Sequence, residues 1–195
     1  MRVDVMCERI SLRICGVVVL AAGVAVALPG CKKQDESSAV PWKSGVTVIG
    51  GNLGWDAESD RTLDPRAPTA DLWWELRSET TSSLTPTNGT AFAIARNANY
   101  NRISPNFIRR ARMAPQRLET NNKDNVLAPG TVIVFRTSDG ALGKLQIVAY
   151  RPLHDLSFPG AAAYLDQWKQ EALRRPNYER AHIEVKWSLF LPDDQ

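Results

Sequence analysis

The side chains that could carry out chemistry in this chain are few and widely spaced. Of the three cysteines, Cys7 and Cys15 lie near the N-terminus and Cys31 directly follows an apolar stretch. The two histidines, His154 and His182, are 28 positions apart. Zinc sites in proteins are built mostly from closely spaced pairs of Cys and His ligands. The sequence therefore does not predict a zinc site.

Four carboxylates follow one another at short intervals in residues 54–68, which are otherwise rich in turn-forming residues: Asp56, Glu58, Asp60 and Asp64. The first three alternate along the chain, as the ligands of a calcium loop do. An EF-hand loop needs a glycine at its sixth position, where this chain has Arg61. We therefore expect a solvated acidic loop with no bound metal, and the sequence indicates no cofactor.

None of the common catalytic motifs is present: there is no Gly-x-Ser-x-Gly, no His-Glu-x-x-His and no phosphate-binding glycine loop. His154 and Asp155 are adjacent, so on a strand their side chains would point to opposite faces. His182 would begin the polar face of a strand, where we expect it at the surface. Asp71 and Glu75 would share one strand face about 13 Å apart, too far for paired catalytic carboxylates. No catalytic residue is predicted, and a binding protein is favoured over an enzyme.

The segment that ends at Cys31 is typical of an export signal. Three arginines lie near the start of the chain, 17 uncharged residues follow from residue 14 to residue 30, and the sequence turns polar directly after Cys31. The apolar run is shorter than the roughly 20 residues that span a bilayer. Its last four residues, Leu28-Pro29-Gly30-Cys31, resemble the lipobox of bacterial lipoproteins, although Pro29 stands where alanine, serine or threonine is commoner.

This resemblance implies that residues 1–30 are a signal peptide that is removed. Cys31 would then carry a diacylglycerol on its sulfur and a fatty acid such as palmitate on its amine. The exported protein would be anchored to a bacterial membrane, on its periplasmic face or at the cell surface. Two alternatives stay open at this point: ordinary secretion with cleavage elsewhere, or an uncleaved anchor helix.

The remaining 165 residues are enough for one domain with one hydrophobic core. With Cys31 lipidated no disulfide is possible, so the fold must be stabilised by packing alone. Residues 31–45 are rich in Lys, Ser, Asp and Pro, which predicts a lipidated cysteine followed by a flexible tether. Residues 46–195 are predicted to form a single α+β domain.

Alternation of apolar and polar residues predicts a mainly antiparallel sheet of five or six strands. We expect strands at residues 46–49, 71–77, 91–95, 130–137, 144–150 and 182–191. Ser104 and Pro105 form the start signal of a short helix that would run to residue 112. Apolar residues at helical spacing predict a longer helix over residues 160–175, inserted before the last strand. Short segments such as 71–74 and 84–89 resemble uncharacterised exported bacterial proteins, which implies export and no particular activity.

Four residues form the candidate binding surface: Trp73, Arg109, Arg110 and Arg112. Trp73 would point away from the core, either covered by a loop or exposed as a stacking platform. The arginines belong to residues 96–117, which contain six arginines and no acidic residue. Arginine suits phosphate and carboxylate partners. Alternatively, this basic segment pairs with the acidic residues 56–79 of the same fold, or is a solvated helix face.

The net charge of the chain after residue 30 helps to decide which kinds of partner to expect. After removal of the signal peptide the chain would carry 21 basic and 19 acidic side chains, and this near-neutral balance does not indicate a nucleic-acid-binding protein. We expect a lipid-anchored cell-envelope protein that acts as a non-catalytic binding or assembly module for an anionic cell-wall or lipid component or for a protein partner. The alternative is an envelope hydrolase acting on glycan or peptide. The sequence does not indicate an oligomeric state.

Overall fold

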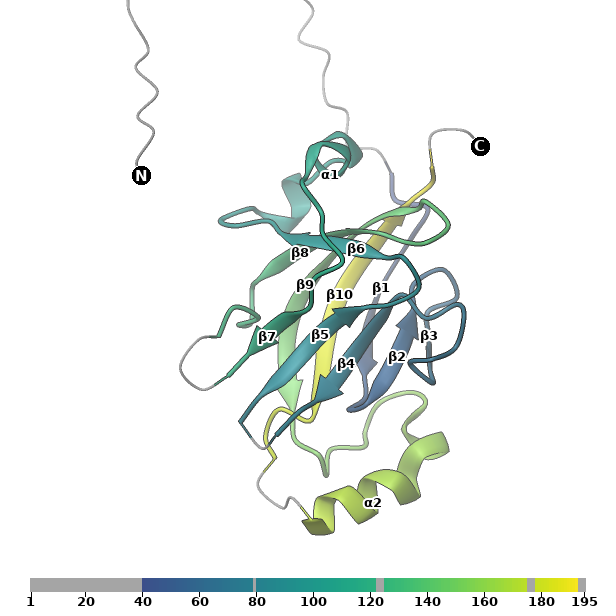
Figure 1. The fold of residues 1–195 in the computed structure, drawn as a ribbon, viewed down its shortest axis with the longest axis vertical. Coiled ribbons are helices and arrows are strands. Elements are labelled where there is room, and N and C mark those ends of the chain that lie inside the picture. Colours follow the sequence, from purple (N-terminus) through teal and green to yellow (C-terminus); the bar gives the residue numbers. More distant parts are fainter. Residues whose placement is uncertain (1–39, 79, 122–124, 175–177, 193–195) are drawn as a thin grey trace, which may run out of the picture. The chain divides into compact units, whose positions relative to one another are not determined.

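The structure is a computed structural model that describes residues 40–78, 80–121, 125–174 and 178–192 (Figure 1). The predicted signal peptide, Cys31 and most of the predicted tether lie outside these residues. The described chain has an α+β fold dominated by antiparallel strands, with one short helix and one longer helix, which confirms the predicted fold class. None of the helices in the described ranges is long and apolar enough to cross a bilayer.

The strands form two five-stranded sheets, whereas the sequence predicted a single sheet. Sheet 1 contains, in spatial order, β1 (Lys43–Ile49), β10 (His182–Phe190), β9 (Leu142–Arg151), β8 (Val132–Arg136) and β6 (Ala91–Ile94). Sheet 2 contains β3 (Arg61–Leu63), β2 (Leu53–Asp56), β4 (Leu72–Leu76), β5 (Ser82–Pro86) and β7 (Leu118–Thr120). Of the strands in sheet 2 only β4 was predicted, because the other four are short and lie in segments without a clear alternation of apolar and polar residues.

Strand β1 begins at Lys43, three residues earlier than predicted, so residues 43–45 of the predicted tether belong to the sheet. Lys43 pairs with Leu189 and Ile49 with Ile183, which makes β1 an edge strand held along its length by β10. The described chain therefore enters the domain through sheet 1, at the end where β10 finishes.

The two sheets share one hydrophobic core. Trp55 and Trp74 from sheet 2 are both 0 % exposed, and Trp55 packs edge to face against Trp187 of sheet 1 with ring centroids 5.5 Å apart. Gly143 in β9 pairs with Phe135 in β8, and a Cβ atom at Gly143 would overlap the Phe135 ring. Close packing of large aromatic rings between the sheets stabilises the fold in the absence of a described disulfide.

A second, smaller core covers part of the outer face of sheet 1. It is formed by the 3₁₀ turn Tyr100–Arg102 and by α1 (Pro105–Arg110), which pack through Tyr100, Ile103 and Ile108 onto residues of β8, β9 and β10. The Ser104 hydroxyl accepts a hydrogen bond from the Phe107 N–H at 3.3 Å, as the predicted helix cap requires. This covering segment forms one wall of the site described below.

The opposite end of the domain is closed by the 3₁₀ turn Ala161–Tyr164 and by α2 (Leu165–Arg174) (Figure 1). Trp168 of α2 is 2 % exposed, as predicted, and its indole N–H donates to the Gly51 carbonyl at 3.3 Å. A Cβ atom at Gly50 would overlap the Trp168 ring, so the turn between β1 and β2 needs glycine for this close approach. The inserted helix therefore seals the end at which the chain passes from sheet 1 to sheet 2.

Candidate functional site

The site lies on the outer face of sheet 1, beside the segment that covers the other half of that face. Ser44, Ser188 and Lys144 are cross-strand neighbours on β1, β10 and β9, and Lys186 is two positions from Ser188 on the same face. The 3₁₀ turn covers the β8 side of this face and leaves the β1 side open. A pocket of about 470 Å³ results, and its lining includes Pro41, Tyr100, Arg102, Lys144, Lys186 and Ser188. Among the residues that the structure describes, no acidic side chain lines it.

Lys144 forms the floor of this basic pocket. Its side chain is 7 % exposed, and its ammonium group donates to the carbonyls of Tyr100 and Ile103, both at 2.9 Å. The same ammonium lies 4.7 Å from the centroid of the Tyr100 ring and 5.5 Å from that of Phe190. An ammonium group has three N–H donors, and within the described chain the third has no acceptor. The pocket therefore contains a buried ammonium group in a fixed orientation, and one of its N–H groups has no acceptor among the described residues.

Lys186 adds a second cation at the same place. Its ammonium lies 4.9 Å from the centroid of the Tyr100 ring, so both lysines share that ring. Burial lowers the pKa of Lys144, and the positive charge of Lys186 lowers this pKa further. Among the described residues no carboxylate lies within 4.0 Å of either ammonium. Two like charges are thus held close together without a counter-ion from the described chain.

The nearby carboxylate on this face of β10 is already engaged. Glu184, two positions before Lys186, accepts hydrogen bonds from Arg151 at 2.7 and 2.9 Å. Both bonds are accepted by Oε2 of Glu184 and are charge-assisted, which makes them stronger than hydrogen bonds between neutral groups. Glu184 therefore neutralises Arg151 rather than the lysine pair.

Hydroxyl groups complete the basic pocket. The hydroxyls of Tyr100 and Ser188 are 2.8 Å apart, and burial raises the pKa of Tyr100, so this phenol stays neutral at physiological pH. Ser44 and Ser104 also line the pocket. Cations together with neutral hydroxyls are the groups that bind phosphate and carboxylate oxygens. The arrangement can hold an anion.

The four predicted binding residues do not form one surface. Trp73 belongs to β4 and points away from the core on the outer face of sheet 2, whereas Arg109, Arg110 and Arg112 lie in or just after α1, on the outer face of sheet 1. Trp73 is half-buried beside Pro65, and its indole N–H has no hydrogen-bond partner within the described chain. Of the two alternatives considered for Trp73, cover by a loop or exposure as a stacking platform, the structure agrees with the first.

The arginines of α1 differ in their surroundings. Arg109 donates to the Asn106 side chain at 2.6 Å. Arg110 is exposed and lines a small pocket with Arg102 and Phe107, directly beside the basic pocket. Arg112 is exposed just after the helix. For Arg110 and Arg112, pairing with a carboxylate of the described chain is not seen.

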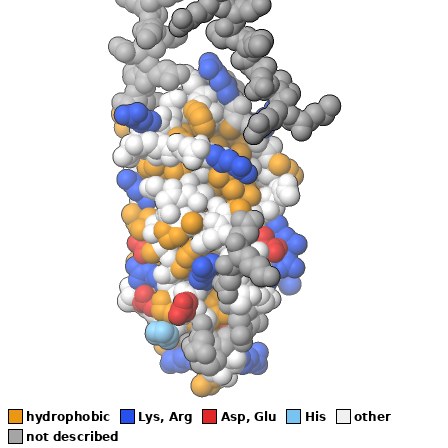
Figure 2. Space-filling view, turned by 90° about the vertical axis from the view of Figure 1, so that its left-hand side faces the viewer, with side chains coloured by type: hydrophobic (Ala, Val, Ile, Leu, Met, Phe, Trp, Pro, Cys, Tyr) orange, Lys and Arg blue, Asp and Glu red, His pale blue; other side chains and the backbone are white. Residues whose placement is uncertain are grey.

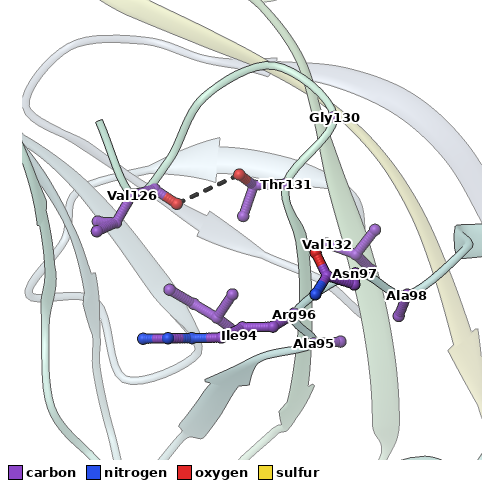
Figure 3. A pocket seen from close by; sticks show the side chains of 9 residues that line it. All are labelled: Ile94, Ala95, Arg96, Asn97, Ala98, Val126, Gly130, Thr131 and Val132. Atoms are coloured by element: carbon purple, nitrogen blue, oxygen red, sulfur yellow. Dashed lines mark hydrogen bonds between the residues drawn. The ribbon is translucent and has the colours of Figure 1, made fainter. Parts of the chain in front are cut away.

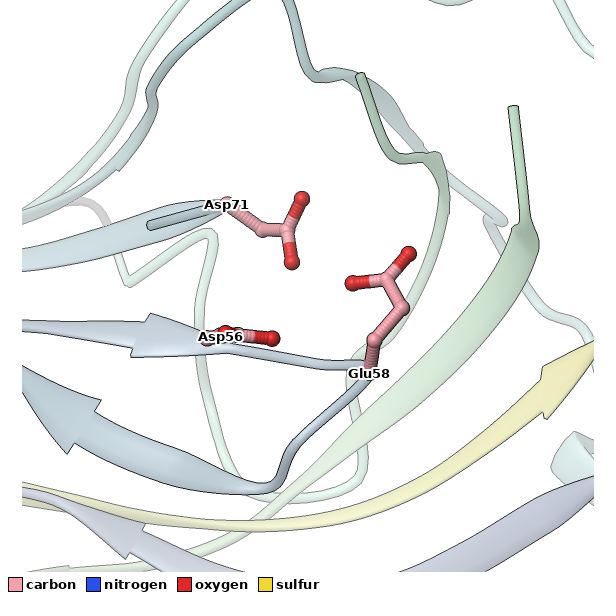
Figure 4. Close-up of side chains that lie close together, drawn as sticks. All are labelled: Asp56, Glu58 and Asp71. Atoms are coloured by element: carbon pink, nitrogen blue, oxygen red, sulfur yellow. The ribbon is translucent and has the colours of Figure 1, made fainter. Parts of the chain in front are cut away.

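The acidic residues form a separate cluster, and its members differ from those of the predicted loop (Figure 4). One carboxylate oxygen each from Asp56, Glu58 and Asp71 lies within 4.8 Å of the others. Asp71, expected on a polar strand face, is instead 2 % exposed and accepts hydrogen bonds from the Ala57 N–H at 2.9 Å and the Thr90 hydroxyl at 3.1 Å. Burial raises the pKa of Asp71 to about 8, and the negative charge of Glu58 adds to this. Asp71 therefore keeps its proton at neutral pH, which reduces the repulsion within the cluster.

The histidines are not arranged for catalysis. His182, predicted at the surface, is 0 % exposed because the residues around Phe158 and α2 cover this end of β10. Its Nδ1 accepts from the Gly51 N–H at 3.0 Å and its Nε2 lies 3.3 Å from the Leu153 carbonyl, so both ring nitrogens are engaged by backbone. His154 is exposed. In the part of the chain that the structure describes, neither histidine bonds a serine or threonine hydroxyl, so the hydrolase alternative has no nucleophile with a histidine base.

A further pocket of about 650 Å³ lies between β6 and the start of β8 (Figure 3). Of its described lining residues only Arg96 is charged, and the Thr131 hydroxyl there already donates to the Val126 carbonyl at 3.2 Å. This pocket offers fewer free polar groups than the basic pocket, which remains the stronger candidate for a functional site.

Comparison of the chain with models of protein families, with curated proteins and with solved structures finds no match. The geometry of the basic pocket is therefore the basis for a functional interpretation.

Proposed function

We propose that the protein is a lipid-anchored cell-envelope protein, exported and held on a bacterial membrane through Cys31, that acts as a non-catalytic binding module for an anionic envelope component. The observation that carries this proposal is the pair Lys144 and Lys186, which share the ring of Tyr100 without a carboxylate partner in the described chain. The lipobox-like sequence at residues 28–31 supports the location.

The physical reason is electrostatic. Two neighbouring cations in a partly buried site raise each other's free energy, and an anion between them removes that cost. Lys144 is already held by two carbonyls, so little side-chain freedom is lost when an anion binds. Arg102 at the pocket rim can add a planar, two-pronged contact to a phosphate or carboxylate.

Thermal unfolding in the presence of small anions tests the pocket. The full-length chain, purified in detergent, is unfolded at constant ionic strength with inorganic phosphate, glycerol phosphate or glucuronate. A ligand that binds only the folded state raises Tm. We expect at least one of these anions to raise Tm, and we expect Lys186→Gln to abolish that rise.

Lys169→Gln is the matched control, because Lys169 is an exposed lysine on α2 at the opposite end of the domain. It removes the same charge and should retain the response of the unmodified protein. If none of the three anions raises Tm, or if the two variants respond equally, the pocket is not an anion site and the proposed function is wrong.

The anchor is tested separately by metabolic labelling with a fatty-acid probe. The unmodified chain should incorporate the label and fractionate with membranes, whereas Cys31→Ala should do neither. Label that persists in Cys31→Ala would contradict the lipid anchor, since one acylated cysteine is all that the resemblance implies.

A further inference from the structure

We propose that the end of the domain bearing the basic pocket docks onto the membrane that holds the lipid anchor, with the phosphate of an anionic phospholipid in the pocket. This inference rests on the proposed function and specifies its ligand. Three features of that end support it: the length of chain that leads to it, its exposed apolar side chains and its charge.

The length of the chain keeps the pocket near the anchor. Pro41 lines the basic pocket and lies ten residues after Cys31. Ten residues span at most about 36 Å even when fully extended. Whatever conformation these residues adopt, the mouth of the pocket stays within that distance of the acylated cysteine, and so of the leaflet in which its acyl chains would be inserted.

Exposed apolar side chains gather at the same end. Val40 and Trp42 immediately precede β1 and are 88 % and 46 % exposed, and Leu191 immediately follows β10 and is 42 % exposed. Phe107, 46 % exposed, lies in the first turn of α1 and lines the small pocket that adjoins the basic pocket. Tryptophan and phenylalanine favour the interface between lipid and water. These four side chains could enter that interface around the pocket.

The charged side chains exposed around the pocket are basic, although Asp139 is exposed in the β8–β9 turn at the same end of sheet 1. Arg102, Arg110 and Lys186 are exposed around the pocket, and Arg112 is exposed just beyond α1. On the face shown in Figure 2, the charged side chains nearest the α1 end are lysine or arginine, and acidic side chains appear from about the middle of the domain towards the α2 end. A leaflet rich in anionic lipid attracts such a surface, and salt weakens the attraction. The polarity of the domain thus directs its α1 end to the membrane.

Fluorescence quenching by lipid tests the docking. The full-length lipidated chain is reconstituted into vesicles of brominated phosphatidylcholine, with or without phosphatidylglycerol. Trp42 is the exposed tryptophan at the proposed contact, whereas Trp55, Trp74, Trp168 and Trp187 are at most 2 % exposed. Trp73 is half-buried on the outer face of sheet 2, away from the proposed contact. We expect quenching to increase several-fold when phosphatidylglycerol is present, to fall when salt is added, and to be lost in Trp42→Phe.

The charge variants identify the contact. Lys186→Gln and Arg102→Gln should each reduce the quenching in phosphatidylglycerol vesicles, whereas Lys169→Gln should leave it unchanged. Both changed residues in the pocket are exposed, so circular dichroism should show an unchanged fold. Equal quenching with and without phosphatidylglycerol, or equal quenching in Lys186→Gln and Lys169→Gln, would overturn the inference.

The outcomes also separate this inference from the proposed function. If small anions raise Tm but phosphatidylglycerol has no effect on quenching, the pocket binds an anion from another source and only the docking is wrong. Salt-sensitive co-sedimentation with purified cell-wall sacculi would then identify a wall polymer as that source. If neither small anions nor phosphatidylglycerol has an effect, both proposals fail together.

Discussion

The rings of His182 and Trp168 meet edge to face with their centroids 4.8 Å apart, inside the end of the domain that α2 covers. This contact joins the last strand of sheet 1 to the inserted helix. Because both nitrogens of His182 are bonded to backbone groups, the imidazole is held in one orientation and is kept from water. The stability of the domain should consequently depend on the charge of this ring.

Acid should destabilise the domain through His182. Burial lowers the pKa of His182 from 6.5 to about 4. Above pH 6.5 the ring is neutral in both the folded and the unfolded state, so it contributes no pH dependence. Between about pH 6.5 and pH 4 the unfolded chain binds the proton and the folded chain does not, so the free energy of unfolding falls as pH falls, by up to about 3 kcal/mol. Asp71 gives a dependence of opposite sign over the same range, so the loss is measured as the difference in urea unfolding between the unmodified chain and a variant that lacks His182.

Two variants isolate the histidine responsible. His182→Asn lowers stability overall, but its free energy of unfolding should increase relative to that of the unmodified chain as pH falls from 6.5 to 4, because only the opposing contribution of Asp71 remains. His154→Gln should leave the dependence as it is, because His154 is exposed. An equally steep dependence in His182→Asn would show that another group titrates.

Alkali should destabilise the domain through Asp71. Its carboxyl keeps its proton in the folded state up to about pH 8 but ionises near pH 3.8 when unfolded. Over this interval the folded state binds more protons, so the free energy of unfolding decreases as pH rises. Asp71→Asn should make unfolding by urea less dependent on pH between 6.5 and 8, where His182 contributes no pH dependence. Asp139→Asn, in an exposed turn, should not change the slope, and a similar slope in both variants would exclude the assignment to Asp71.

Removing the phenol of Tyr100 should cost about 1 kcal/mol of stability, the usual net value of a buried neutral hydrogen bond. Tyr100→Phe keeps the ring beside both lysines but deletes the 2.8 Å contact with Ser188. A double-mutant cycle with Ser188→Ala, measured by denaturant unfolding, isolates that contact. If the two single changes are strictly additive, the hydroxyls do not interact.

A methyl group at Gly143 should destabilise the core by about 1–3 kcal/mol, the range found when a packed interior is overfilled. The added Cβ would overlap the Phe135 ring, which is 0 % exposed and cannot move into solvent. Gly45→Ala is the control, because its Cβ would lie 3.1 Å from the Trp187 ring on an edge strand. Thermal unfolding should rank Gly143→Ala well below Gly45→Ala, and the reverse order would contradict the packing described.

Elements with strong local signals could be predicted from the sequence. The alternation in residues 72–76 placed Trp74 in the core and Trp73 outside it, and the serine followed by proline at 104–105 predicted the start of α1. The hairpin of β8 and β9 followed from its turn at Asp139-Gly140. These signals lie within a few residues of the structure they specify.

Features that depend on distant partners could not be predicted. Sheet 2 pairs β2 with strands on both of its sides, and no local pattern marks residues 53–63 as strands. The carbonyls that hold Lys144 come from a segment about 40 residues earlier, so the local sequence indicated a strand but not the buried position of this lysine. His182 is likewise buried by α2. The sequence of this helix does not indicate which part of the sheet the helix packs against. The basic pocket was missed for the same reason.

The pairing of β1 with β10 also bears on when the domain can fold. Lys43 lies opposite Leu189, so the first and last strands of the described chain close sheet 1 together. Contacts between residues so far apart in sequence form slowly, because a long loop must be closed before they contribute. Sheet 1 is therefore incomplete until nearly the whole chain has been synthesised. For a chain carrying the proposed export signal, this delay favours a loose, unfolded state during passage through the secretion channel and postpones completion of the pocket until the last strand has crossed.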